Sequence, residues 1–275
     1  MVVFPNAKVN LGLNVIERRP DGYHNIESVM APVDWCDILE IVPSHTGTTT
    51  LTVTGNAVDC PSEKNLVMKA YRALSAEVSI PAVEIHLHKI IPDGAGLGGG
   101  SADAAYTLKA LNALFELGIS DERLAAVAAT IGADCPFFIY NRPMLVEGIG
   151  TRMTPLELDL SHYHILIVKP EASVSTAQAY AGVSPTLPDV SVVSCVARRP
   201  EHWQASGLKN DFEKSVFTLL PEVARVKTTL EQSGALYTSM SGSGSAVYAI
   251  FDDVNMAERA RAMFKGMKTH LGNFF

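Results

Sequence analysis

The sequence predicts an α+β protein with two lobes, and three observations lead to that prediction. Strand patterns dominate residues 7–91, two helix patterns follow them, and a loop-like stretch at residues 148–163 precedes a second group of strands and helices. Separate runs of strands and of helices, rather than regular alternation, are typical of α+β folds. We therefore expect two domains, formed by residues 1–155 and 156–275.

The strands of the first domain are expected at residues 7–16, 23–33, 37–42, 48–55 and 83–91. One helix, residues 63–78, precedes the last of these strands and has apolar side chains at helical spacing. Two more helices follow a glycine-rich segment. We expect Ser101 to cap the first of them and Gly118 to end it. Ser120 and Gly132 have the same roles for the second.

The second domain begins with a strand at residues 164–170. Helix patterns follow at residues 175–183, 211–220 and 221–234. Two strands, residues 235–240 and 245–251, then flank a short loop of glycine and serine, and residues 254–267 form the last helix.

Composition excludes several classes of protein. A net charge of −7 with no long basic run argues against nucleic-acid binding, and no stretch of 18 apolar residues indicates a membrane span. The first residues lack the basic and apolar regions of a signal peptide. The four cysteines are far apart, and the pair His86 and His88 has no third metal ligand nearby. We expect a cytoplasmic protein with reduced thiols, and we expect no metal bound by the cysteines or by the histidine pair.

Five of the seven residues from Gly94 to Gly100 are glycine, directly before a helix. The letters GAGLGG fit the dinucleotide-binding pattern, but that fold requires a second strand after the helix, and here another helix follows. A Walker A loop requires a lysine that the chain lacks. A phosphate site at the helix N-terminus remains, because free N–H groups and the helix dipole favour anions there. A tight structural turn is the alternative.

Two segments carry polar residues in unusual settings. On the first strand one face is apolar, and the other consists of Lys8, Asn10, Gly12 and Asn14; it either borders a cleft or faces solvent. Asp134 lies among apolar residues in GADCPFF, so its carboxylate needs a partner unless it bonds its own turn.

Two loops complete the candidate set. Residues 20–22, Pro-Asp-Gly, form a turn before Tyr23 and His24, and residues 241–245 join two strands. Ordinary hairpins are the alternative for both.

The segment PDGAGLGGGSADAA, residues 92–105, resembles the central motif of the GHMP kinases. PNAKVNLGLNV and SGSGSAVYAIF resemble the first and third motifs of that family. The resemblance implies a ribosomal-S5-like α/β domain followed by a ferredoxin-like α+β domain. RRPDGYH and GADCPFF resemble the members that phosphorylate the 2-hydroxyl of 4-diphosphocytidyl-2-C-methyl-D-erythritol in the non-mevalonate isoprenoid pathway. Together the motifs span nearly the whole chain.

The resemblance also implies roles for single residues. Asp134 would accept the proton of the attacked hydroxyl, and Lys8 would be its partner and steady the phosphoryl group. Asn65 and Lys89 would flank adenine. From the residues themselves, Asp103 is expected in the first turn of the helix, where an acid suits the dipole but would repel phosphate, so we expect it to face the ribose or the helix surface. The residues expected to bind ATP are Asn65, Lys89, Pro92, Gly94, Gly96, Leu97, Gly98, Gly99, Gly100, Ser101 and Asp103.

For the substrate, the resemblance implies a small molecule with a cytidine diphosphate group. His24 would recognise the cytosine, and Tyr23 and Tyr180 would stack on it. The residues expected to bind the substrate are Asn10, Tyr23, His24, Asp134, Ser175, Thr176, Tyr180 and Gly242. Gly99 and Gly100 stand where the wider family has serines, so Mg²⁺ would be held by phosphates and water. We expect a monomer or a homodimer.

Three other interpretations remain open. Another GHMP kinase, acting on homoserine or mevalonate, is disfavoured by GYH and GADCPFF. A regulator that binds nucleotide without catalysis is disfavoured because Lys8 and Asp134 are both present. A dehydrogenase is the most distant alternative.

Overall fold

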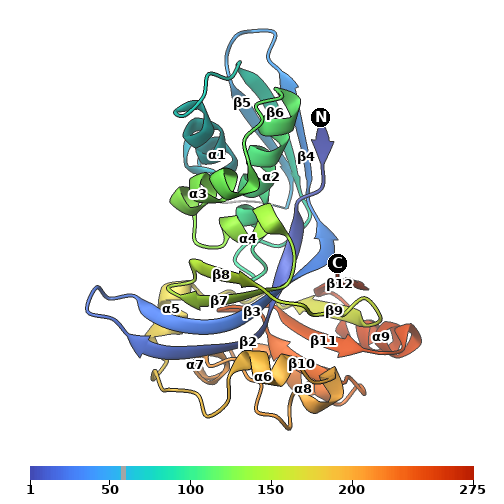
Figure 1. Cartoon of the computed structure of the whole chain (residues 1–275). Coiled ribbons are helices and arrows are strands. Elements are labelled where there is room, and N and C mark those ends of the chain that lie inside the picture. Colours follow the sequence, from blue (N-terminus) through green and yellow to red (C-terminus); the bar gives the residue numbers. More distant parts are fainter. Residues whose placement is uncertain (57–59) are drawn as a thin grey trace. The chain divides into compact units, whose positions relative to one another are not determined.

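The chain folds into a mixture of helices and sheets, in agreement with the predicted α+β class (Figure 1). This computed structural model describes residues 1–56 and 60–275. Contacts divide the chain into a first unit of residues 1–7, 35–93 and 98–141 and a second unit of residues 8–34, 94–97 and 142–275. These units are interleaved along the sequence, whereas the division at residue 155 cuts the chain once. That division stays a prediction.

The first unit contains a sheet with the strand order β1-β4-β6-β5. β4 pairs antiparallel with β1 and β6, and β5 pairs parallel with β6. α2 packs against β4 and β1, and the helices also pack on one another. The elements are β1 (Val2–Val3), β4 (Ile38–Pro43), β5 (Thr50–Gly55), β6 (Val83–Lys89), α1 (Leu66–Ser75), α2 (Gly99–Leu114), α3 (Asp121–Ile131) and α4 (Cys135–Tyr140), with a short 3₁₀ helix at Ser62–Lys64.

Helix α2 begins and ends earlier than the sequence predicts. Gly98 adopts the left-handed conformation, at φ 73°, and turns the chain so that helical geometry begins at Gly99; Ser101 therefore lies inside the helix and is not its cap. At the other end Glu116 already has φ 51°, so the helix ends before Gly118. The predicted caps of α3 are correct, because the Ser120 side chain accepts a bond from the Arg123 N–H and the helix ends at Gly132.

The second unit contains two sheets, with the strand orders β2-β3-β7-β8 and β10-β11-β9-β12. Most of β2 and β3 belongs to this unit, while their outer ends belong to the first. The strands are β2 (Asn6–Arg18), β3 (His24–Cys36), β7 (Met144–Gly148), β8 (Arg152–Pro155), β9 (His164–Lys169), β10 (Tyr237–Met240), β11 (Val247–Phe251) and β12 (Lys268–Asn273). The helices are α5 (Thr176–Ala181), α6 (Val192–Val196), α7 (Phe212–Leu219), α8 (Pro221–Glu231) and α9 (Val254–Arg261), with 3₁₀ turns at Pro200–His202 and Ala262–Phe264.

Several short elements were not predicted from the sequence: β1, β7, β8, β12, α4 and α6. β8 lies in the stretch that was expected to be a loop, and it pairs antiparallel with β7. Four residues are too few for a clear alternation of apolar and polar side chains, so only pairing identifies this strand.

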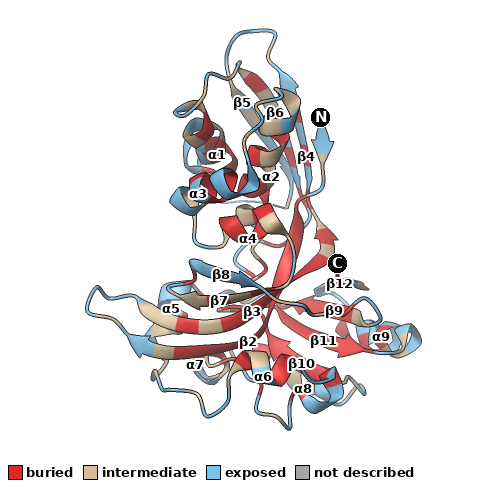
Figure 2. Cartoon of the chain, viewed as in Figure 1, coloured by how far each residue is buried: buried red, intermediate tan, exposed pale blue. Residues whose placement is uncertain are grey.

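The core of the second unit joins β2 and β3 to the C-terminal sheet. Leu13 and Val15 of β2 pack in one apolar cluster with Leu166 of β9 and with Phe251 of β11, and helices α7, α8 and α9 contribute to it. Figure 2 shows β2 buried along most of its length. This packing fixes the strand that carries Lys8.

Among the described residues, no helix is both long enough and apolar enough to cross a membrane.

Candidate functional site

The polar face of β2 is buried and internally bonded. Lys8 and Asn10 are 3% and 1% exposed, so the alternative of a solvated strand face is wrong. Lys8 Nζ donates to Asn10 Oδ1 at 2.6 Å and to the carbonyl of Gly96 at 3.0 Å. Asn10 Nδ2 in turn donates to Ser28 Oγ at 2.8 Å. These bonds satisfy donors of a buried ammonium group, whose burial would otherwise be costly.

The first part of the glycine segment, residues 94–97, contacts the loop at residues 241–244. Ser241 Oγ donates to the Gly96 carbonyl at 2.9 Å, so this oxygen accepts from both Lys8 and Ser241. Gly96 has φ 76°, and a Cβ there would lie 2.0 Å from the Ser241 carbonyl oxygen. Only glycine fits this close approach of two backbones, which gives one glycine of the segment a definite structural reason. Gly242 packs on the same residue, because a Cβ at Gly242 would lie 3.2 Å from the Gly96 carbonyl oxygen.

The second part of the segment forms the start of α2. No side chain caps this end, whose N-cap residue is Gly98. Gly99, Gly100 and Ser101 then supply the first N–H groups of a 16-residue helix. These donors and the helix dipole suit a phosphate.

Lys89 does not lie at a solvated strand end. Its ammonium, 4% exposed, binds the carboxylates of Asp37 and Asp103, the latter at 2.7 Å. Asp103 is buried in this cluster, so the expectation that it faces the ribose or the helix surface is wrong. Burial is the main cause that raises the pKa of Asp103, to about 7, against the opposing effect of Lys89.

Asp37 connects this cluster to the residues that precede the glycine segment. Its Oδ1 accepts bonds from the backbone N–H groups of Ile90 and Ile91, at 2.5 and 2.8 Å. Pro92 follows and is buried. The cluster therefore holds the end of β6 and the second turn of α2 together. The direct contact of Lys89 with adenine stays a prediction.

Two other predicted nucleotide residues have structural partners. Asn65 caps α1, because its Oδ1 accepts from the Val67 N–H at 3.0 Å. Leu97 is buried, and its carbonyl accepts from the Lys8 N–H at 2.9 Å. Their contacts with ATP stay predictions.

Asp134 is the residue before α4, and its side chain makes no capping bond to that helix. The next residue, Cys135, is buried and interacts with Ser101 of α2, while burial raises the pKa of its thiol to about 11. The first unit thus brings the residue after Asp134 to the first turn of the proposed phosphate helix. Lys8 belongs to the other unit, so the pairing of Lys8 with Asp134 stays a prediction.

Two of the predicted cytosine residues, His24 and Tyr180, lie together in the second unit. The rings of His24 and Tyr180 stack with centroids 4.7 Å apart and an angle of 21° between their planes. Phe212 meets the Tyr180 ring edge-on at 4.7 Å. Burial lowers the pKa of His24, and nearby Arg18 lowers it further. Tyr23 is 62% exposed, and its stacking on a base stays a prediction.

Ser175 and Thr176 begin α5. Ser175 forms a capping box with Gln178, so its hydroxyl has a local structural role. Thr176 Oγ1 lies 3.3 Å from Ser243 Oγ in the loop at residues 241–245. That loop thus contacts residues predicted for the nucleotide and residues predicted for the substrate.

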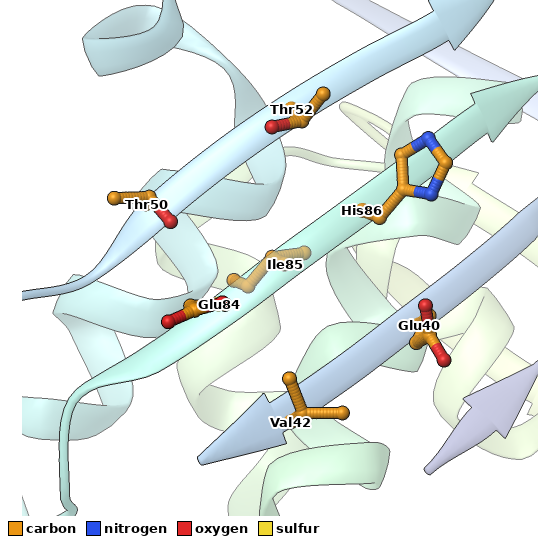
Figure 3. Close-up of a pocket in the computed structure, with 7 residues that line it drawn as sticks. All are labelled: Glu40, Val42, Thr50, Thr52, Glu84, Ile85 and His86. Atoms are coloured by element: carbon orange, nitrogen blue, oxygen red, sulfur yellow. The ribbon is translucent and has the colours of Figure 1, made fainter. Parts of the chain in front are cut away.

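A hollow of about 250 Å³ lies elsewhere, on the exposed face of the sheet of the first unit (Figure 3). It is lined by Glu40, Val42, Thr50, Thr52, Glu84, Ile85 and His86. None of the predicted site residues lines it, and two carboxylates make it unsuited to a polyphosphate. It is therefore not the candidate site.

Sequence reasoning missed two residues that bond predicted site residues, Asp37 in the first unit and Ser241 in the second. Asp37 directly precedes a strand of apolar alternation, and a buried acid at such a position signals a cationic partner. Ser241 lies in the third motif, but its bond to Gly96 joins positions 145 residues apart, which spacing does not reveal. Within the described residues, no group of three or more His, Cys, Asp or Glu side chains could hold a metal ion.

Comparisons with known proteins give one consistent result. The family model for the GHMP kinases N terminal domain matches residues 65–142, and the model for the GHMP kinases C terminal matches residues 198–268. The chain is 51% identical to the 4-diphosphocytidyl-2-C-methyl-D-erythritol kinase of Parabacteroides distasonis, over 92% of each chain. It is 38% identical to the kinase of that name from Salinibacter ruber, over 96% of this chain and 95% of the relative.

Solved structures agree with these relatives. A crystal structure of 4-(cytidine 5'-diphospho)-2C-methyl-D-erythritol kinase matches with a TM-score of 0.84 at 34% identity, covering 100% of this chain and 99% of the other. Homoserine kinase from Cytophaga hutchinsonii matches with a TM-score of 0.75 at 21% identity, covering 98% and 95% of the two chains, which shows a shared fold.

Proposed function

Because the chain belongs to the GHMP kinases, we propose that it transfers the γ-phosphoryl group of ATP to the 2-hydroxyl of 4-diphosphocytidyl-2-C-methyl-D-erythritol. The products are the 2-phosphate and ADP, in the supply of isoprenoid precursors by the non-mevalonate pathway. The observation that carries the proposal is the identity of 51% along 92% of both chains with a relative of that name. We keep the expectation of a cytoplasmic enzyme that is a monomer or a homodimer.

The start of α2 in the first unit suits the phosphates of ATP. The uncapped start of α2 offers N–H groups to its phosphates, and the glycines there present no side chain that would hinder the approach. Phosphoryl transfer requires positioning and charge stabilisation more than covalent chemistry. Mg²⁺ offsets the phosphate charge when it is bound. We propose no protein ligand set for it and assign its coordination to phosphates and water.

The proposed roles follow from chemistry. Asp134 accepts the proton of the 2-hydroxyl, a role suited to a carboxylate whose neighbour Cys135 interacts with Ser101 in the first turn of α2. Lys8 stabilises charge on the transferring group, because hydrogen bonds to Asn10 and to the Gly96 carbonyl hold its buried ammonium in place. His24 and Tyr180 form one wall of the cytosine site, since the stacked pair places histidine nitrogens that can bond the base beside an aromatic ring.

A coupled assay of ADP release tests the proposal. We expect turnover with the cytidyl substrate and no turnover with homoserine or mevalonate. Binding of ATP without turnover on any of the three alcohols would support a non-catalytic regulator instead. Turnover on homoserine or mevalonate alone would indicate a different GHMP kinase.

A further inference from the structure

The peptide group of Ala172 is held by three different elements of the second unit. Its carbonyl accepts from Lys169 Nζ, at 2.9 Å, and from Ser245 Oγ. Its N–H donates to Glu222 Oε1, at 2.8 Å. Lys169 ends β9, Ser245 belongs to the loop before β11, and Glu222 lies in the first turn of α8. Both lone pairs of this carbonyl are thus used, which fixes its orientation.

Lys169 is an unusual residue for this place, because it is only 6% exposed. Its ammonium donates to the carbonyls of Pro170 and Ala172 and to Ser173 Oγ, at 2.7, 2.9 and 3.3 Å. Burial lowers its pKa, Lys268 lowers it further, and Glu222 opposes both. The three N–H groups of the Lys169 ammonium therefore bind one short segment, residues 170–173, and these bonds offset the free-energy cost of burying the charge.

This segment leads directly to the proposed cytosine wall. Residues 170–175 end at the capping box of α5, and α5 carries Tyr180. The Tyr180 ring stacks on His24 and meets Phe212 edge-on. A helix of only six residues has little rigidity of its own, so the position of its first turn sets the position of that ring.

The loop at residues 241–245 contacts the glycine segment as well. Ser241 Oγ donates to the Gly96 carbonyl, and the Ala246 N–H donates to the Ala95 carbonyl at 3.1 Å. Ser243 and Ser245 bond Thr176 and Ala172 on the other side. One serine-rich loop thus carries bonds both to the segment expected to hold ATP and to the segment that leads to Tyr180.

We propose that Lys169 and Ser245 are positioning residues for the cytidyl end of the substrate, acting through the Ala172 carbonyl on the start of α5 and so on Tyr180. The inference rests on the proposed function, because it assigns Tyr180 to the cytosine. Neither residue touches the reacting atoms. Their loss lowers affinity for the base and leaves the phosphoryl-transfer step in place.

Ser245→Ala and Lys169→Met test this inference. Each removes one or more bonds of about 1 kcal/mol, so we expect the KM for the cytidyl substrate to rise about fivefold or more. The kcat and the KM for ATP should change less than about twofold. Cytidine diphosphate, titrated calorimetrically without ATP, should show a parallel rise in Kd. Lys268→Met removes a neighbouring positive charge from the partner strand β12 and serves as the control, with both KM values unchanged.

The outcomes separate the inference from the proposed function. Folded variants that bind the cytidyl substrate like the parent overturn the inference alone, and so does an equal rise of both KM values. A parent enzyme that neither binds cytidine diphosphate nor turns over the cytidyl substrate overturns the proposed function, and the inference with it. Thermal unfolding establishes that the variants are folded. Should Lys169→Met not fold, Ser245→Ala decides, since it removes a single hydroxyl.

Discussion

The buried carboxyl group of Asp103 shows how strongly its surroundings change a single side chain. Its Oδ2 binds Lys89, while its Oδ1 has no hydrogen-bond partner. Burial raises its pKa to about 7, Lys89 opposes that rise, and the charge of Asp37 adds to it. The folded protein therefore retains a proton here at pH values where the unfolded chain has released it.

Asp103 is expected to make stability fall as pH rises from 3.8 to about 7. The sign follows because the native state binds more protons than the unfolded state in that range. Asp103→Asn should remove this loss. The unfolding free energy of the variant minus that of the parent should therefore increase by on the order of 1–4 kcal/mol from about pH 5 to about pH 8. Urea unfolding at both pH values measures the gain.

Asp253→Asn is the control for that experiment. Hydrogen bonds from the Asn255 N–H group lower the pKa of Asp253, so its contribution to stability is lost only as pH falls below 3.8, in the opposite direction and outside the range of this experiment. A difference between Asp103→Asn and its parent that does not change with pH would contradict the prediction.

Asp134→Asn is expected to lower kcat by about 10²–10⁴ while leaving ATP affinity nearly intact. The amide keeps the size of the side chain but accepts no proton. Single-turnover kinetics and ATP titration measure the two effects. Asp121→Asn, at the exposed start of α3, is the control and should retain activity. Full activity of Asp134→Asn would show that another group is the base.

At the scale of elements, the glycine segment combines two different demands. Gly96 lies against the backbone of Ser241, whereas a Cβ on Gly94 would meet nothing within 4 Å, although both residues have positive φ. The sequence shows five glycines without distinguishing between these roles. Only the packing of the segment against residues 241–244 shows that Gly94 needs glycine for its backbone conformation alone, whereas Gly96 also needs it to avoid a clash.

Gly96→Ala should therefore be much more harmful than Gly94→Ala. Gly94→Ala adds the cost of a left-handed alanine, about 1–2 kcal/mol. Gly96→Ala adds the same cost and also forces the Ser241 loop away, so ATP affinity should fall with stability. Thermal unfolding and the KM for ATP measure the contrast. Equal effects of the two substitutions would contradict the close approach at Gly96.

At the scale of the whole molecule, the chain passes several times from one unit to the other. Leu13, Val15 and Ile26 come before residue 155, yet they pack in the apolar cluster of the second unit with side chains that come after it. A single cut therefore divides a core that is continuous in space.

A fragment of residues 1–155 is expected not to fold into its native structure alone. It would expose the apolar faces of β2 and β3 that Leu166 and Phe251 cover in the full chain. Amide NMR spectra of the fragment, with the full chain as the control, test this expectation. A well-dispersed spectrum of the fragment alone would show that its core suffices.

Most long elements were predictable because their signals are local. Alternation identified β2, β3 and β6, and helical spacing identified α1, α2 and α8. Short strands such as β8 and the one-turn helix α4 were missed, because pairing and packing define them rather than periodicity. Capping was predicted correctly at Ser120 and wrongly at Ser101, where a left-handed Gly98 starts the helix instead.

The sequence by itself determined the fold class, the kinase family and the residues that carry its motifs, because those signals are patterns of neighbouring residues. The tertiary structure alone decided which partners these residues have. In it, Lys89, Asp103 and Asp37 form a buried ion cluster, and the His24 ring stacks on that of Tyr180. It also joined Gly96 to Ser241 and Ala172 to Ser245. Such contacts join residues far apart in the chain, so local sequence patterns do not predict them.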